Sequence, residues 1–149
     1  MITQFSRSQV DEELYLVLRT IFHYERSINS KVGLDYQQIY ALQFLRRNDN
    51  ARLTEIAAEL ELPMFTTSRM IDRLEAKGYL SKEQDTKDRR NLHIHLQPAG
   101  EAILKMIEDS SFERISQNVE KLDHKEIEEL MGLAQKLHVI LGVSEKVNK

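Results

Sequence analysis

The sequence contains no cysteine among its 149 residues. That absence excludes disulfide bonds, thiolate nucleophiles, thiolate metal ligands and redox sensing through a thiol. Only two prolines and five glycines are present, so we expect few long irregular segments. No apolar run approaches the roughly 20 residues that a bilayer-spanning helix needs. Residues 1–8 also lack the basic start and apolar centre of a signal peptide. We therefore expect a cytoplasmic protein with no membrane partner.

The net charge is −3, so the strongly basic balance of many nucleic-acid-binding proteins is missing. Residues 46–90 carry ten Lys and Arg against nine Asp and Glu, which leaves a local charge of only +1. Any argument for an anionic partner must therefore rest on where the cations lie. The hydrophobic share of 41% is sufficient for a core, and the charged share of 30% suits helices with solvated faces.

Apolar residues recur at helical spacing at both ends of the chain. The pattern predicts helices over 8–30 and from Asp35 to Leu45, where the polar connection 46–50 follows, and again over 99–122 and 123–141, with Asp35 as an N-cap and Asp123 and Glu126 as a capping box. The terminal helices have long apolar stripes but no globular core of their own. Because such a stripe is disfavoured on a monomer's surface, we expect it to be covered by a second copy of the chain.

The middle of the chain changes its period twice. A short helix from Leu53 is followed by the turn Leu62-Pro63 and by a second helix that ends at Gly78. Two alternating strands then flank a polar loop over 85–91. This order predicts a mostly α fold, a winged helix-turn-helix with six helices and a two-stranded β-wing. Within the single chain 1–149, we expect a winged-helix lobe over 35–97 and a helical dimerisation region over 1–34 and 98–149.

Two groups of side chains could contact DNA. On the second helix of the motif, hydroxyl groups and arginines can bond phosphates and base edges. The residues that carry these groups are Thr66, Thr67, Ser68, Arg69 and Arg73. The alternative is an ordinary solvated helix face. On the loop, Lys87, Arg89 and Arg90 repel one another, and an exposed pair with Asp88 provides only ~0–1 kcal/mol. A polyanionic partner explains this cluster better, and an arginine at a hairpin tip suits a narrow minor groove.

On these motifs the chain resembles the MarR family of bacterial transcriptional regulators. The resemblance covers essentially the whole chain and is carried by 53–57, 68–80, 85–90 and 92–100. It implies a homodimer on double-stranded DNA, usually a repressor, with one half-site of a pseudo-palindromic operator for each subunit and half-sites ~10 bp apart. It also implies that Arg90 enters the minor groove, and that Asp88 orients the wing by pairing with an arginine of the lobe.

Two positions depart from the family pattern. Met64 and Phe65 follow Pro63 where the family often has polar residues, and a Phe cannot hydrogen-bond a base, although it can touch a thymine methyl group or pack inward. Gln97 stands where the family usually has a capping threonine, which weakens the cap of the next helix.

Aromatic and polar groups gather on the first two predicted helices, where core and interface packing is the simplest explanation. The resemblance implies a second use, a pocket for a small phenolic or carboxylate effector that releases the protein from DNA; its candidate residues are His23, Tyr36, Tyr40 and Phe44. Because the chain lacks cysteine, we expect effector binding rather than thiol oxidation to be the switch.

Other functions find less support. His93 and His95 share one face of a strand, a spacing that can hold a metal, but no third ligand is near in sequence. We predict no metal and no cofactor, with a metal-responsive regulator as an alternative. No Gly-rich phosphate loop or nucleophile elbow occurs, so we do not expect an enzyme. A winged-helix module that binds protein is the other alternative, favoured by the near-neutral lobe and by Phe65.

Overall fold

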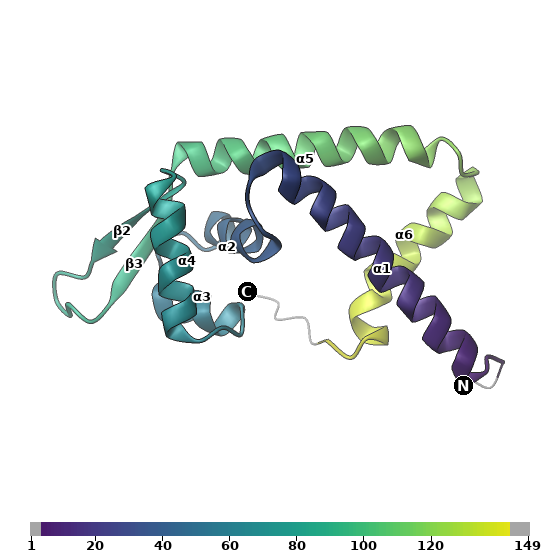
Figure 1. Ribbon diagram of the computed structural model, residues 1–149, viewed down its shortest axis with the longest axis horizontal. Coiled ribbons are helices and arrows are strands. Elements are labelled where there is room, and N and C mark those ends of the chain that lie inside the picture. The colour runs from purple at the N-terminus through teal and green to yellow at the C-terminus, as the bar shows by residue number, and fades with distance from the viewer. Residues whose placement is uncertain (1–3, 144–149) are drawn as a thin grey trace. The chain divides into compact units, whose positions relative to one another are not determined.

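The computed structural model describes residues 4–143. These residues form six α-helices and three short strands (Figure 1). The helices are α1 (Arg7–Val32), α2 (Tyr36–Arg47), α3 (Leu53–Glu59), α4 (Met64–Ala76), α5 (Pro98–Val119) and α6 (His124–Ile140), and the strands are β1 (Ala51–Arg52), β2 (Leu80–Gln84) and β3 (Leu92–Leu96). The predicted mostly α winged-helix fold is confirmed. The outermost parts of the predicted helical region, 1–3 and 144–149, lie outside the described residues.

Local sequence signals set the helix ends. The side chain of Asp35 accepts a hydrogen bond from the backbone N of Gln38 at 2.8 Å, and Asp123 accepts one from Glu126 at 2.9 Å. Each cap thereby satisfies one of the free N–H groups of a first helical turn. Both predicted caps are confirmed. α1 ends at Gly33, whose φ of 66° is the left-handed conformation that a helix end often requires.

The sheet has three antiparallel strands in the order β1-β3-β2, one more than the predicted two-stranded wing. The hairpin register pairs Leu80 with Leu96 and Lys82 with Ile94. β1 is only two residues long, too short to show a period in the sequence. It forms because Asn50, with a φ of 64°, turns the chain so that buried Ala51 pairs with Ile94.

The core of the lobe is formed by buried side chains from each of the elements around it. Leu42, Ile56, Ile71, Leu74 and Ile94 are fully buried, and they come from α2, α3, α4 and β3. In Figure 1 the β2–β3 hairpin extends past α4 and away from these helices. The core therefore anchors α4 and the base of the hairpin, while the hairpin tip lies outside the core.

The first half of α5 belongs to this core as well, since Leu104 and Ile107 are buried in the same cluster. The chain divides into two compact units, Met1–Ile107 and Glu108–Lys149. Gly100 sits where α5 begins, and a Cβ atom there would stand 2.2 Å from the backbone O of Tyr79. The start of α5 is thus pressed against the chain that leaves α4.

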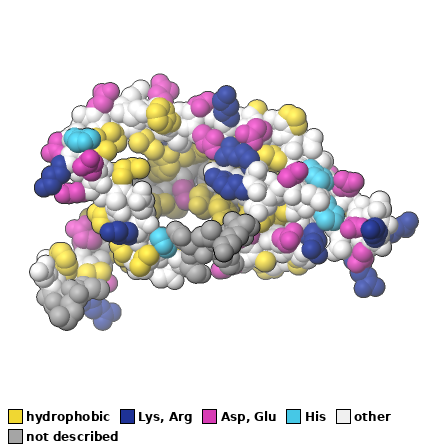
Figure 2. Space-filling view, turned by 180° about the vertical axis from the view of Figure 1, so that it is seen from behind, with side chains coloured by type: hydrophobic (Ala, Val, Ile, Leu, Met, Phe, Trp, Pro, Cys, Tyr) yellow, Lys and Arg dark blue, Asp and Glu magenta, His cyan; other side chains and the backbone are white. Residues whose placement is uncertain are grey.

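Apolar side chains remain open on α1 and α6. Neither α1, over Arg7–Val32, nor α6, over His124–Ile140, contains a buried residue. Exposed apolar residues include Leu14, Leu18 and Ile21 on α1 and, in the second unit, Leu130 and Leu137 on α6. Figure 2 shows such hydrophobic side chains, in yellow, open at the surface. Within residues 4–143, no helix combines the length and apolar composition that crossing a membrane requires.

Candidate nucleic-acid interface

α4 presents two different faces. Its inner face is fixed by Thr67, Met70, Ile71 and Leu74, all buried. Its outer face is open, and Thr66, Arg69 and Arg73 are exposed there. Ser68 is half-buried between the two faces. Because 13 residues give a helix about 20 Å long, this outer face is of a size to lie in a major groove, which is about 12 Å wide.

Thr67 does not lie on the outer face, although it was predicted to contact DNA. Its side chain has no exposed surface, and its hydroxyl donates to the backbone O of Pro63 at 3.1 Å. The periodicity of the helix places Thr67 three residues before Met70, on the same buried stripe. Thr67 therefore supports the helix start, and we omit it from the interface.

The two apolar residues at the start of α4 point outward. Met64 is 45% exposed and Phe65 is 71% exposed. The guanidinium carbon of Arg69 lies 5.4 Å from the centre of the Phe65 ring, within the range of a cation–π contact. Of the two uses that the sequence allowed for Phe65, packing inward is thus excluded.

The loop of the wing is ordered by its own acidic residues. Asp85 Oδ1 accepts hydrogen bonds from the backbone N of Lys87 at 2.7 Å and of Asp88 at 3.2 Å, and these bonds lower the pKa of Asp85 below its usual value. Lys87, Arg89 and Arg90 are all exposed. Figure 2 shows Lys and Arg side chains, in dark blue, gathered at the outer end of the hairpin. The loop therefore has a fixed backbone and carries solvated cations.

Asp88 takes a different role from the predicted one. Its Oδ1 atom accepts from the backbone N of Arg90 at 3.0 Å, which shapes the loop tip. Among the ion pairs of the described residues, none joins Asp88 to an arginine of the lobe. The short Asp88 side chain is used within its own turn, as Asp side chains commonly are.

Lys82 holds the wing to α4, a role that was missed in the sequence. Its Nζ atom lies 2.7 Å from Asp72 Oδ1 and 2.7 Å from Glu75 Oε2, and its backbone N donates to Glu75 Oε1 at 3.2 Å. Hydrogen bonds to Asp72 and Glu75 raise the pKa of Lys82 above 10.5. A signal was present, because Lys82 alternates with Leu80 on the inward side of β2, where a lysine needs a charged partner.

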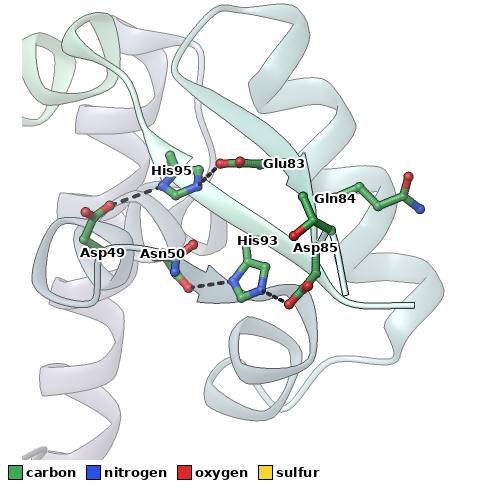
Figure 3. Close-up of a pocket in the computed structure, with 8 residues that line it drawn as sticks. Asp49, Asn50, Glu83, Gln84, Asp85, His93 and His95 are labelled. Atoms are coloured by element: carbon green, nitrogen blue, oxygen red, sulfur yellow. Dashed lines mark hydrogen bonds and ion pairs between the residues drawn. The ribbon is translucent and has the colours of Figure 1, made fainter. Parts of the chain in front are cut away.

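The two wing histidines lie at the base of the hairpin, in a depression between the β1 turn and β2 (Figure 3). His93 Nδ1 lies 3.2 Å from the backbone O of Asn50, and its Nε2 lies 3.3 Å from Asp85 Oδ2. The Asn50 carbonyl, followed by Asp85, raises the pKa of His93 above 6.5, because both favour the protonated ring.

His95 points to other partners than His93 does. Its Nδ1 atom lies 3.5 Å from Asp49 Oδ1, and its Nε2 atom lies 3.2 Å from Glu83 Oε2 without hydrogen-bond geometry. The part of the chain that the structure describes contains no group of three His, Asp or Glu side chains arranged to hold a metal ion.

The four predicted effector residues are placed differently from one another. Tyr36 and Tyr40 stack on α2 with ring centres 6.3 Å apart, and the hydroxyl of Tyr40 donates to Glu59 Oε1 at 2.7 Å. That hydrogen bond to a carboxylate raises the pKa of Tyr40. Phe44 packs against the core, and exposed His23 contacts the ring of Phe22 on α1. The tyrosines form a pair, while Phe44 and His23 have other neighbours.

α3, α4 and the β2–β3 hairpin together form the winged helix of DNA-binding transcriptional regulators. Over residues 34–92 the chain matches the sequence model of the MarR family. It is similar to the HTH-type transcriptional regulator YkoM of Bacillus subtilis, with 29% identity over 142 residues, 91% of this chain and 92% of that one.

Solved structures have the same fold. A MarR family protein from Bacillus stearothermophilus has a TM-score of 0.76 at 22% identity and covers 93% of this chain and 99% of its own. FabT of Streptococcus pneumoniae, solved in complex with DNA, has a TM-score of 0.71 at 17% identity and covers 92% and 98% of the two chains. At these identities the likeness establishes the fold alone.

Proposed function

We propose that this protein is a homodimeric repressor that binds a pseudo-palindromic operator and is released from it by a small-molecule effector. The observation that carries the proposal is the pairing of two open surfaces on one rigid lobe. The outer face of α4 offers Arg69 and Arg73, and the wing tip offers Lys87, Arg89 and Arg90. Lys82 fixes the wing to α4, so both surfaces can meet one duplex together.

The two surfaces suit different parts of DNA. A helix with arginines and hydroxyl groups near its N-terminus reads base edges in the major groove. An exposed arginine at a hairpin tip suits the negative potential of a narrow minor groove. We therefore assign Thr66, Ser68, Arg69 and Arg73 to the major groove and backbone, and Arg90 to the minor groove. The net charge of −3 does not oppose this, since Lys87, Arg89 and Arg90 lie close together on the exposed loop of the wing.

The exposed apolar faces support a dimer. Leu14, Leu18 and Ile21 on α1 are each more than 40% exposed, and Leu130 and Leu133 on α6 are more than 50% exposed. Helices that leave stripes of this length in water gain free energy by pairing, at about 25 cal/mol for each Å² of apolar surface buried. A two-fold dimer places its recognition helices about one DNA turn apart, ~10 bp between half-site centres.

The proposed effector would bind on α2. The stacked rings of Tyr36 and Tyr40, beside the Glu59 carboxylate, form an aromatic and polar surface suited to a small phenolic ligand. A ligand can release the protein from DNA only if it binds the free conformation more tightly than the bound one.

The test begins with selection of binding sequences from a random duplex pool, followed by titrations of the best duplex at several salt concentrations. We expect tight binding that falls steeply with salt, because each phosphate contact releases counterions. Arg90→Ala should weaken binding and reduce the slope of log K against log salt by about 1.8, since a dimer loses two cations at ~0.9 each. Arg7→Ala, on the exposed first turn of α1, is the matched control and should leave the slope unchanged.

The outcomes are distinct. Equal slopes for wild type and Arg90→Ala would remove Arg90 from the interface. A protein that enriches no sequence and shows no salt dependence would refute DNA binding and favour the rival function, a winged-helix module that docks on protein. The 71% exposure of Phe65 is the observation that favours this rival.

A further inference from the structure

The start of α4 exposes an aromatic side chain that the fold does not use. Phe65 is 71% exposed, while the buried stripe of the same helix is already filled by Thr67, Met70, Ile71 and Leu74. Replacing Phe65 with a polar residue would therefore leave the lobe's core unchanged. Together with Met64, which is 45% exposed, the ring forms an apolar surface at the start of α4 that is available for a partner to desolvate.

The ring is also held in one place. Arg69 follows Phe65 by four residues, the spacing at which helical side chains meet, and its guanidinium carbon lies 5.4 Å from the ring centre. Arg69 and Phe65 line one depression between α4 and the start of α2, together with Thr66, Arg73 and, at the start of α2, Asp35 and Gln38. The phenyl ring and the cationic group thus form a single surface at the end of the helix that enters a groove first.

The chemistry of the major groove offers one apolar feature. Thymine alone carries a methyl group there, and phenylalanine side chains make apolar contact with it. Arginine pairs with O6 and N7 of guanine through two hydrogen bonds. A ring that touches the methyl group and restrains the arginine would link recognition of the two bases.

We propose that Phe65 reads the methyl group of a thymine in each operator half-site, and that its ring positions Arg69 to read a nearby guanine. This inference rests on the proposed operator binding. It makes Phe65 a specificity-determining residue that recognises a thymine without a hydrogen bond, and Arg69 a base-reading residue whose geometry depends on the ring.

The experiment replaces thymines of the selected duplex, one position at a time, with deoxyuridine, which removes only the methyl group. Dissociation constants are measured for wild type, Phe65→Ala, Phe65→Leu, Met64→Ala and Arg69→Ala, with Arg7→Ala as the control outside the proposed interface. For wild type we expect one thymine of each half-site at which the change weakens binding about fourfold, and about fifteenfold when both half-sites are changed, as burial of one methyl group predicts.

The variants separate the two parts of the inference. Phe65→Ala should bind more weakly and be indifferent to deoxyuridine at that thymine, while Arg7→Ala should keep the wild-type sensitivity. Phe65→Leu should keep much of the methyl sensitivity, because leucine is also apolar, but lose part of the preference for guanine that Arg69→Ala abolishes. Since Phe65 is exposed, the variants should fold, which circular dichroism checks.

Equal methyl sensitivity of wild type and Phe65→Ala at every thymine would overturn the inference, as would a sensitivity that disappears in Met64→Ala instead. In both cases sequence-specific binding remains, so the proposed function stands. A wild-type protein that selects no duplex at all removes the proposed function as well, which is a different result.

Discussion

Lys82→Met tests whether the wing is held to α4 by charge. The Lys82 ammonium lies 2.7 Å from a carboxylate oxygen of both Asp72 and Glu75. The Lys82 side chain is 25% exposed, and those of Asp72 and Glu75 are 56% and 38% exposed, so water screens both pairs in part. Pairs of this kind contribute about 0.2–1 kcal/mol each, which sets the sum for two at about 1 kcal/mol. Methionine keeps most of the apolar stem, so lost packing adds little.

The assay is urea unfolding followed by circular dichroism, at one fixed protein concentration because a dimer's stability depends on it. With a slope of about 2 kcal/mol/M, the loss moves the midpoint down by about 0.5 M. The exposed loop lysine gives the matched control, and Lys87→Met should change the free energy of unfolding by less than about 0.5 kcal/mol. Because the pKa of Lys82 is raised, its contribution is complete at neutral pH and is lost only as strongly alkaline solution deprotonates it.

High salt and a second substitution test whether the loss in Lys82→Met comes from the two ion pairs. In 1 M salt the screening length is about 3 Å, so the difference between Lys82→Met and wild type should shrink. Asp72→Asn should have less effect in the Lys82→Met background than alone, because the two residues share one interaction. An unchanged urea midpoint in Lys82→Met, or a loss that 1 M salt leaves intact, would show that the pairs do not hold the wing.

Two further predictions concern the lobe. Gly100→Ala should destabilise the protein by about 1–3 kcal/mol, because the new Cβ would stand 2.2 Å from the backbone O of Tyr79. Gly132→Ala on α6 should instead stabilise the protein by about 0.5–1 kcal/mol, because a Cβ atom there would have nothing within 4 Å. Equal effects of the two substitutions in thermal melts would contradict the packing described for α5. In an NMR titration His93 should show a pKa above 6.5 that falls, but not fully to 6.5, in Asp85→Asn, because the Asn50 carbonyl still favours the protonated ring. The stability that His93 contributes is then complete below pH 6.5 and is lost as the pH rises through its folded pKa. The stability that Asp85 contributes, since its pKa is lowered, is lost as the pH falls below 3.8. A His93 pKa that Asp85→Asn leaves unchanged would refute the contact.

The sequence by itself determined the helices, the wing and their order. Periods of 3.6 and 2 are properties of neighbouring residues, and so are capping residues such as Asp35 and Asp123, whose predicted hydrogen bonds are present. The exposed cations of the loop could be recognised for the same reason, since a run of polar residues between alternating strands has no core to enter.

Only the tertiary structure decided which partner each side chain meets. β1 forms because two residues pair with an edge of β3, and Leu104 and Ile107 join the core because α5 starts against it. Lys82 bonds acidic residues on another element, while Asp88 turns back on its own loop. Contacts between elements depend on distances that packing sets, and no local pattern encodes them.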